Sequence, residues 1–243
     1  MQRNVRHIQQ LASRVELSRL SRRQLRDLWV VQELVRQQHQ MHRERTHAVA
    51  GRIVSLSQPH VRPIVRGKLA DPVEFGAKLS VSVMGGYCYL DRLSWDNYNE
   101  SGDLITQVER YRDRYGHYPT SVHSDKAYRS RENLRYCQER RIRLSGPALG
   151  RPRKDRVRSR FLRRQQCLDE RVRVEIEGKF GVSKRKYSLS RVMAKQARTS
   201  ETAIGIVFLV MGLEKATRIL FSRLAIFLFR LPRGPDYMEY AAE

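Results

Sequence analysis

The pattern of hydrophobic and polar residues predicts helices at both ends of the chain and strands in between. From residue 1 to about 47, Leu and Val recur at three- and four-residue spacing among Arg and Gln, which is typical of a helix. Lys78–Val83 alternates apolar and polar residues, Gly85–Gly86 is a strong two-residue turn signal, and Tyr87–Leu90 is apolar again. The pattern therefore predicts a β-hairpin after the N-terminal helical region.

The middle of the chain alternates predicted helices and strands. A helix is expected over about 102–115 and ends at Gly116; a short strand over 120–124 follows and ends at Asp125. A helix over about 129–141 and a strand over 142–145 come next. This interleaving predicts an α/β fold with a partly parallel sheet. Active residues in such folds gather at the carboxyl ends of strands, which is where Asp125 lies.

Two further helices are expected, over about 166–182 and from Thr199 or Ser200 to about Phe229, the second with a break near Arg218. Its run Ala203–Leu213 is strongly apolar but shorter than the roughly 20 residues that span a bilayer, so a buried helix is expected. Residues 146–165 hold Pro, Gly and many arginines and are expected to form an extended connector. The predicted regions are 1–48, a basic helical arm; 49–191, the α/β domain; and 192–243, a helical region.

The charge of the chain changes this picture most. The 243 residues carry a formal net charge of +23 and a pI near 10.7. Such an excess favours a polyanionic partner, since each cation that neutralises a phosphate releases a counterion, although anionic membranes attract the same charge. The N-terminal arm can accordingly be a DNA-facing helix pair or only a charged amphipathic arm. The three cysteines lie far apart without metal-site spacing, which predicts reduced thiols in the cytoplasm.

The most informative local pattern is Arg173-x3-Glu177-x6-Lys184. On a helix the three side chains fall on one stripe, so a carboxylate is flanked by two cations. A carboxylate that binds Mg²⁺ beside cations that bind phosphate would look like this. A solvated helix with one ordinary ion pair would look the same.

This stretch resembles the Arg-x3-Glu-x6-Lys signature of bacterial insertion-sequence DDE transposases of the insertion-sequence four/five group. The family has a tyrosine three residues before the arginine, where this chain has Glu170. Other segments are similar to the family in the same order: Val61–Lys68, Glu74–Lys78, Ser94–Glu100, His123–Arg129, Leu144–Pro152 and Thr199–Ile204. The resemblance implies an RNase H-like core, binding to insertion-sequence ends and target DNA, and metal-dependent DNA cleavage and strand transfer.

The resemblance also implies roles for particular residues. Asp125 and Glu177 match the second and third catalytic carboxylates, which together with a first one would bind Mg²⁺ or Mn²⁺. The expected place of the first carboxylate, Val83–Gly86, holds no acid, and Asp91 is the nearest candidate. Arg173 and Lys184 belong to the matched signature and are expected as accessory residues. DNA contact is also expected from the dense positive charge of the connector, which repels itself unless a polyanion is near, although a solvated linker would have the same composition. The connector cations concerned are Arg151, Arg153, Lys154 and Arg156.

Two function classes follow from these expectations. The first is a transposase, in a truncated and defective copy because a carboxylate is missing and the chain begins partway along the family's usual length. The second is a non-catalytic basic DNA-binding remnant of a transposase. A basic RNA-associated protein fits the charge but not the Asp125 and Glu177 segments. The expected partner is double-stranded DNA and not a membrane, with room for a homodimer on DNA, and the expected location is the bacterial cytoplasm at the nucleoid.

Overall fold

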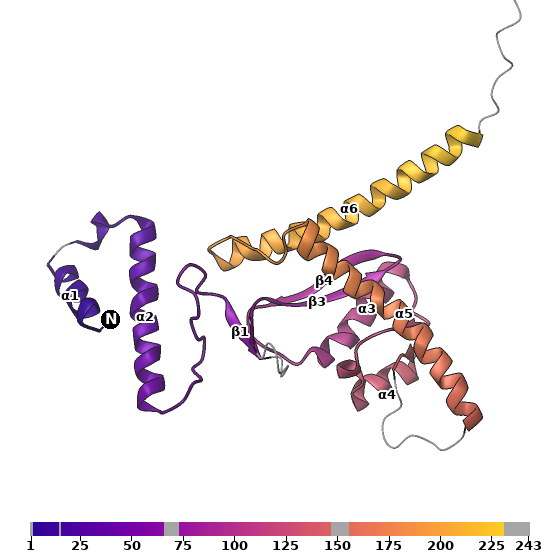
Figure 1. The fold of residues 1–243 in the computed structure, drawn as a ribbon, viewed down its shortest axis with the longest axis horizontal. Coiled ribbons are helices and arrows are strands. Elements are labelled where there is room, and N and C mark those ends of the chain that lie inside the picture. Colours follow the sequence, from indigo (N-terminus) through magenta and orange to yellow (C-terminus); the bar gives the residue numbers. More distant parts are fainter. Residues whose placement is uncertain (1, 15, 66–72, 147–155, 231–243) are drawn as a thin grey trace, which may run out of the picture.

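The computed structural model describes residues 2–14, 16–65, 73–146 and 156–230 (Figure 1). Within these ranges the fold is mixed α/β. The α-helices are α1 (Gln2–Ala12), α2 (Arg22–Arg43), α3 (Asp103–Tyr115), α4 (Arg131–Glu139), α5 (Arg156–Lys186) and α6 (Ala197–Arg230). The strands are β1 (Arg62–Val65), β2 (Val73–Gly76), β3 (Lys78–Met84), β4 (Tyr87–Ser94), β5 (Ser121–Val122) and β6 (Arg143–Leu144). Three 3₁₀ turns join them: η1 (Leu17–Arg19), η2 (Glu100–Gly102) and η3 (Lys126–Tyr128).

The N-terminal region is helical, as the pattern predicts, and consists of the two helices α1 and α2. Ser21 separates them: its hydroxyl accepts the Gln24 N–H and the Gln24 side chain accepts the Ser21 N–H, which is a capping box that starts α2. Figure 1 shows α1 and α2 standing to one side of the remaining elements, linked to them by the segment that enters β1. β1 pairs antiparallel with β2, a strand pair that the hydrophobic pattern did not predict.

The predicted β-hairpin is confirmed as β3 and β4. Gly85 and Gly86 form its turn with φ values of 54° and 78°, a left-handed conformation that glycine adopts without steric cost. The ladder is interrupted opposite Ser80 and Val81: Ser80 pairs with Arg92 and Val81 with Leu90. Asp91 is therefore the extra residue of a β-bulge, and a bulge re-aims the side chain it carries.

The α3–β5–α4–β6 unit follows the predicted order, and β5 and β6 pair in parallel. Gly116 ends α3 in the left-handed conformation with its N–H on the Arg112 carbonyl, and Ser130 caps α4. The core of this unit consists of Leu104, Val108, Cys137 and Ile142. A second core cluster, made of Val81, Cys88, Ile204 and Phe208, joins the β3–β4 hairpin to α6.

Three expectations about the C-terminal half were wrong. Residues 156–165 were expected in an extended connector but form the first turns of α5. α6 begins at Ala197, before the expected cap: Ser200 is buried inside the helix and its hydroxyl donates to the Ala194 carbonyl. α6 also continues through Arg218 without a break.

The apolar run of α6 is buried on one face only. Ile204 and Phe208 are buried against the hairpin, whereas Leu209 and Leu213 are exposed. In the described part of the chain, no helix has the length and apolarity that crossing a membrane requires.

Candidate functional site

Asp125 follows β5 and caps the turn η3. Its Oδ1 accepts the Lys126 backbone N–H at 2.6 Å, so the residue is a turn cap as well as a strand-end carboxylate. Its side chain remains 69% exposed, which leaves the second oxygen open to other ligands. The strand predicted to end at Asp125 is shorter in the structure: β5 ends at Val122, so Asp125 lies three residues beyond it, and the cap orients its carboxylate.

The Arg173, Glu177 and Lys184 positions lie within α5, where their spacing places them on one face. Arg173 Nη2 lies 3.8 Å from a Glu177 oxygen, as the i, i+4 spacing predicts. A closer partner is Glu170, the departure from the family signature, which accepts from Arg173 at 2.8 Å and keeps the pKa of the arginine raised. Lys184 is exposed near the other end of the helix.

Arg173 also joins α5 to the turn after β5. Its Nη1 lies 3.5 Å from Asp125 Oδ1, so one guanidinium contacts both candidate metal ligands. Because its two terminal nitrogens are about 2.3 Å apart, the contacting oxygens of Asp125 and Glu177 lie no more than about 10 Å from each other. Two carboxylates 52 positions apart in sequence thus contact the same guanidinium.

The carboxylates around Arg173 form a local excess of negative charge. Asp125, Glu170 and Glu177 contribute three negative charges against one guanidinium, a formal charge of −2 for these four side chains in a chain of +23. The three carboxylates are 61–69% exposed, so a cation from solvent can reach them. Carboxylate oxygens are hard ligands of the kind that suits Mg²⁺ and Mn²⁺.

The helix that carries Glu177 is fixed in place by an ion pair that sequence reasoning missed. Arg143, in β6, donates two hydrogen bonds to Asp169 in α5, at 2.8 and 2.9 Å, and Gln165 adds a third at 3.1 Å. Asp169 is buried, and the Arg143 guanidinium holds the pKa of its carboxyl below the usual range. The pair lies one helical turn before Arg173, so it sets where α5 crosses the β5–β6 edge.

His123 lies beside the Arg143–Asp169 ion pair as a neutral imidazole. Its Nδ1 lies 3.5 Å from Asp169 Oδ1, and burial lowers the pKa of the imidazole despite that carboxylate. The imidazole is therefore neutral at pH 7, and the charge of Asp169 is balanced by Arg143. No signal in the sequence marks the ion pair of Asp169, since Arg143 and His123 lie 26 and 46 positions away from it.

Asp91 does not join the candidate metal ligands. The bulge turns its carboxylate toward α3, where Gln107 donates to it at 3.2 Å and the guanidinium groups of Arg110 and Arg114 lie 3.4 and 3.8 Å away. The side chain is only 2% exposed. Its contacts are those of a buried structural ion pair, and a catalytic role would require it to leave both arginines.

The acid-free turn Val83–Gly86 contacts the other side of α5. Lys179 donates to the Gly86 carbonyl at 2.8 Å, and two residues along a helix place Lys179 about 200° around the axis from Glu177. An acid introduced at this turn would therefore not face Asp125 and Glu177. Across the described residues, no group of three or more His, Cys, Asp or Glu side chains is arranged to bind a metal ion.

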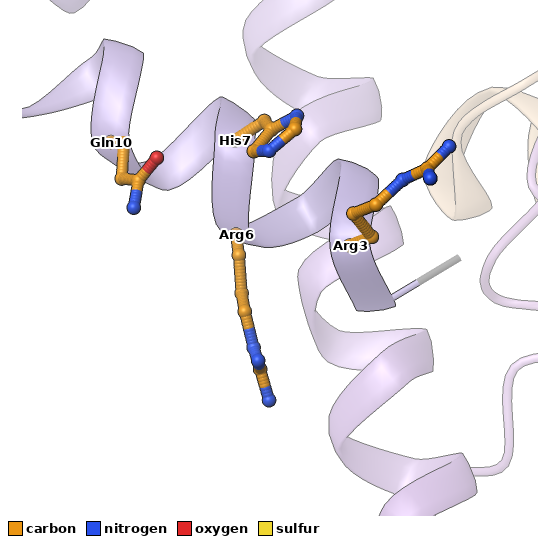
Figure 2. Close-up of a pocket in the computed structure, with 4 residues that line it drawn as sticks. All are labelled: Arg3, Arg6, His7 and Gln10. Atoms are coloured by element: carbon orange, nitrogen blue, oxygen red, sulfur yellow. The ribbon is translucent and has the colours of Figure 1, made fainter.

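The structure describes only some of the cations that are predicted to contact DNA. The side chains of Arg151, Arg153, Lys154 and Arg156 lie outside the described residues. At the other end of the chain, Figure 2 shows Arg3, Arg6, His7 and Gln10 on successive turns of α1. They line a shallow, strongly polar depression of about 340 Å³. Figure 2 shows the Arg3 and Arg6 side chains extending in different directions, so they do not converge on one anion.

The comparisons with known proteins bear on the segment that carries the site. Residues 122–214 match a family model described as a transposase DDE domain. Searches of curated proteins and of solved structures gave no match. The matched segment begins within β5 and ends in α6, so it contains Asp125, the Arg143–Asp169 anchor and the Arg173–Glu177 face. The family match therefore supports a DDE transposase, through the part of the chain in which the two candidate carboxylates converge.

Proposed function

We propose that this protein is an insertion-sequence transposase of the four/five group with an RNase H-like core, which binds double-stranded DNA at element ends and at target sites. The observation that carries the proposal is the sharing of Arg173 by Asp125 and Glu177 inside the segment that matches the transposase DDE domain. The net charge of +23 supports a DNA partner. The bacterial cytoplasm, at the nucleoid, is the corresponding location.

In this proposal Asp125 and Glu177 bind Mg²⁺ or Mn²⁺. The donor set fits: the carboxylates are exposed, offer only oxygen, and lie in a group of side chains with excess negative charge. A bound cation would supply charge stabilisation and an activated nucleophile for phosphoryl transfer on DNA. Arg173 holds the two carboxylates toward each other before the cation arrives, and Lys184 is placed to contact a phosphate on the same face of α5.

We further propose that this chain is impaired in cleavage and strand transfer. Two metal ions carry four positive charges, and DDE chemistry balances them with three carboxylates. Here Asp91 is engaged by Arg110 and Arg114, and the turn at Gly85 has no acid and contacts the wrong side of α5. A non-catalytic DNA-binding remnant is the second candidate, and the same incomplete ligand set favours it.

Metal binding tests the proposed pair directly. Mn²⁺ titrated into the full chain, followed by calorimetry or electron paramagnetic resonance, should report weak binding at one site. Asp125→Asn and Glu177→Gln should each weaken it about tenfold, since each removes one of two anionic ligands. Asp113→Asn is the matched control, because Asp113 is a similarly exposed carboxylate, 65% against 69%. Equal affinity for all four proteins would refute the site.

A cleavage assay separates the two candidates. Labelled duplex carrying element ends is incubated with the chain in Mg²⁺ or Mn²⁺, and nicked and joined products are resolved. DNA binding without products supports an impaired or non-catalytic protein. Strand transfer that requires Asp91 would show instead that Asp91 is the first carboxylate and that the impairment proposed here is wrong.

A further inference from the structure

α6 carries two opposite faces, and only one of them is covered. Ile204 and Phe208 pack on the β3–β4 hairpin, and Trp95 Nε1 donates to Glu201 near the start of the helix. Lys186 of α5 pairs with Glu214 farther along. These contacts fix the first half of α6 to the body of the fold, and Figure 1 shows its second half extending beyond the other elements.

The opposite face has a seven-residue repeat. Apolar residues recur every seven positions at Ile206, Leu213, Leu220 and Phe227, and a second set three residues before each consists of Ala203, Val210, Thr217 and Leu224. These are the d and a positions of a coiled-coil heptad. The four residues of the d set are 51%, 58%, 65% and 61% exposed, respectively, although all are large and apolar. The helix therefore presents an uncovered coiled-coil seam.

Charge is excluded from this seam. Glu214, Lys215, Arg218 and Arg223 are the charged residues between positions 203 and 227, and none occupies an a or d position. From Ala203 to Phe227 the seam is about 36 Å long at 1.5 Å per residue. An exposed apolar strip of this length in a strongly charged chain indicates a contact surface.

We propose that this seam, the a and d positions from Ala203 to Phe227, is a self-association surface on which α6 pairs with α6 of a second copy of this chain. The occupant follows from the repeat: a partner that maintains contact every 3.5 residues over four heptads is another helix of equal length, and a second α6 supplies the same repeat. A membrane surface or an irregular peptide requires no such period.

The area of the seam suits a dimer. Six large apolar side chains, each about half exposed, and the neighbouring Leu209 and Leu228 each offer on the order of 100 Å², so the face supplies roughly 800 Å² per chain. That is the area one partner buries in a standard-size interface. The surface does not include Asp125 or Glu177, so the self-association proposal can be tested separately from the proposed metal chemistry.

Sedimentation equilibrium of the nuclease-treated full chain tests the proposal. A dimer is expected at micromolar concentration, and raising salt from about 0.2 to 1 M should tighten it, because screening weakens repulsion between two chains of +23 while apolar burial remains. An assembly bridged by residual DNA would weaken over the same range. A protein that stays monomeric at all concentrations would overturn the proposal. A monomer that binds vesicles of neutral and anionic phospholipid would overturn it as well, because the apolar face would then contact a membrane.

Substitutions locate the interface. Leu213→Glu and Leu220→Glu should each weaken the dimer at least tenfold, because each buries charge in the seam. Ile226→Glu introduces the same charge on the same helix, at a residue that is 53% exposed but lies off the seam, and should change the affinity less than twofold. Leu213→Ala, which preserves helix propensity, guards against misfolding and should weaken the dimer severalfold. Equal effects of Leu213→Glu and Ile226→Glu would contradict the assignment of the face.

Discussion

The anchor between Arg143 and Asp169 gives the sharpest test of how the candidate site is built. Asp169→Ala removes a carboxylate that is 9% exposed and accepts three hydrogen bonds, two of them from Arg143. Breaking a buried ion pair by removing one partner costs about 3–5 kcal/mol. Arg143 is 45% exposed and can regain water, so the expected loss is smaller, about 2–3 kcal/mol.

For a chain of this size that loss corresponds to a fall in Tm of about 4–12 °C, measured by circular dichroism. The Mn²⁺ affinity of the Asp125–Glu177 pair should fall with it, because α5 is no longer fixed against β6. Glu175→Ala, an exposed carboxylate on the same helix, is the control and should change neither quantity. A double-mutant cycle with Arg143→Ala should give a coupling of about 1–2 kcal/mol. An uncoupled pair, or an Asp169→Ala protein as stable as the control, would refute the reasoning.

The Arg143–Asp169 pair also predicts that its contribution to stability is lost in acid. The pKa of Asp169 is lowered in the folded protein by the hydrogen bonds from Arg143, so the folded state binds its proton less readily than the unfolded chain. Its contribution to stability is complete above the carboxyl pKa of an unfolded chain, about 3.9, and is lost as the pH falls through the lower folded value. The stability difference between the wild type and Asp169→Ala, from urea titrations, should therefore narrow as the pH falls below about 4. A difference that widened in acid would contradict the pair.

Three further outcomes are expected. Asp91→Ala should lower stability by about 2–3 kcal/mol, since it leaves two arginines on α3 without their carboxylate, yet change Mn²⁺ affinity less than twofold; a large loss of affinity would make Asp91 a ligand. Gly86→Ala should cost about 1 kcal/mol in urea unfolding, because its φ is +78° while the nearest atom to a new Cβ is the flexible end of Lys215; no cost would show that the turn relaxes freely. Alanine at the four connector cations should reduce the slope of log K against log salt for duplex DNA by up to about 3.6, at about 0.9 per lost phosphate contact, and an unchanged slope would mean that they are only solvated. These four are Arg151, Arg153, Lys154 and Arg156.

The elements that the sequence predicted correctly are those with local signals. The Gly85–Gly86 turn, the Gly116 helix end and the α3–β5–α4–β6 order all depend on residues within a few positions of one another. The expectation that Asp125 lies near the Arg173 face came from the strand-end rule and from the helical spacing of Arg173 and Glu177, and the contact between Arg173 and Asp125 agrees with it.

What the sequence could not predict depends on contacts between distant segments. The arginine-rich start of α5 was predicted to be an extended connector because of its composition. The sequence pattern alone does not show that these residues continue the helix that follows them. The bulge at Asp91 depends on the pairing of β4 with β3, and a single extra residue decides which way the carboxylate points. The start of α6 at Ala197 was missed because Ser200, a good cap by type, lies inside the helix and donates to the carbonyl of Ala194 in the segment before it.

Glu170 shows how a departure from a resemblance becomes informative once the geometry is known. In sequence it is only a residue that replaces the family's tyrosine. In the structure it is the closest of three carboxylates around Arg173, at 2.8 Å against 3.5 Å for Asp125 and 3.8 Å for Glu177. A guanidinium held mainly by Glu170 competes less for the other two carboxylates, so it leaves them available to a cation while keeping them close. The extra charge at Glu170 also deepens the local negative potential that a divalent ion would meet in an otherwise basic chain. If Asp125 and Glu177 bind a cation as proposed, Glu170→Gln should weaken that binding without removing a ligand, because it takes away the closest partner of Arg173 and one nearby negative charge.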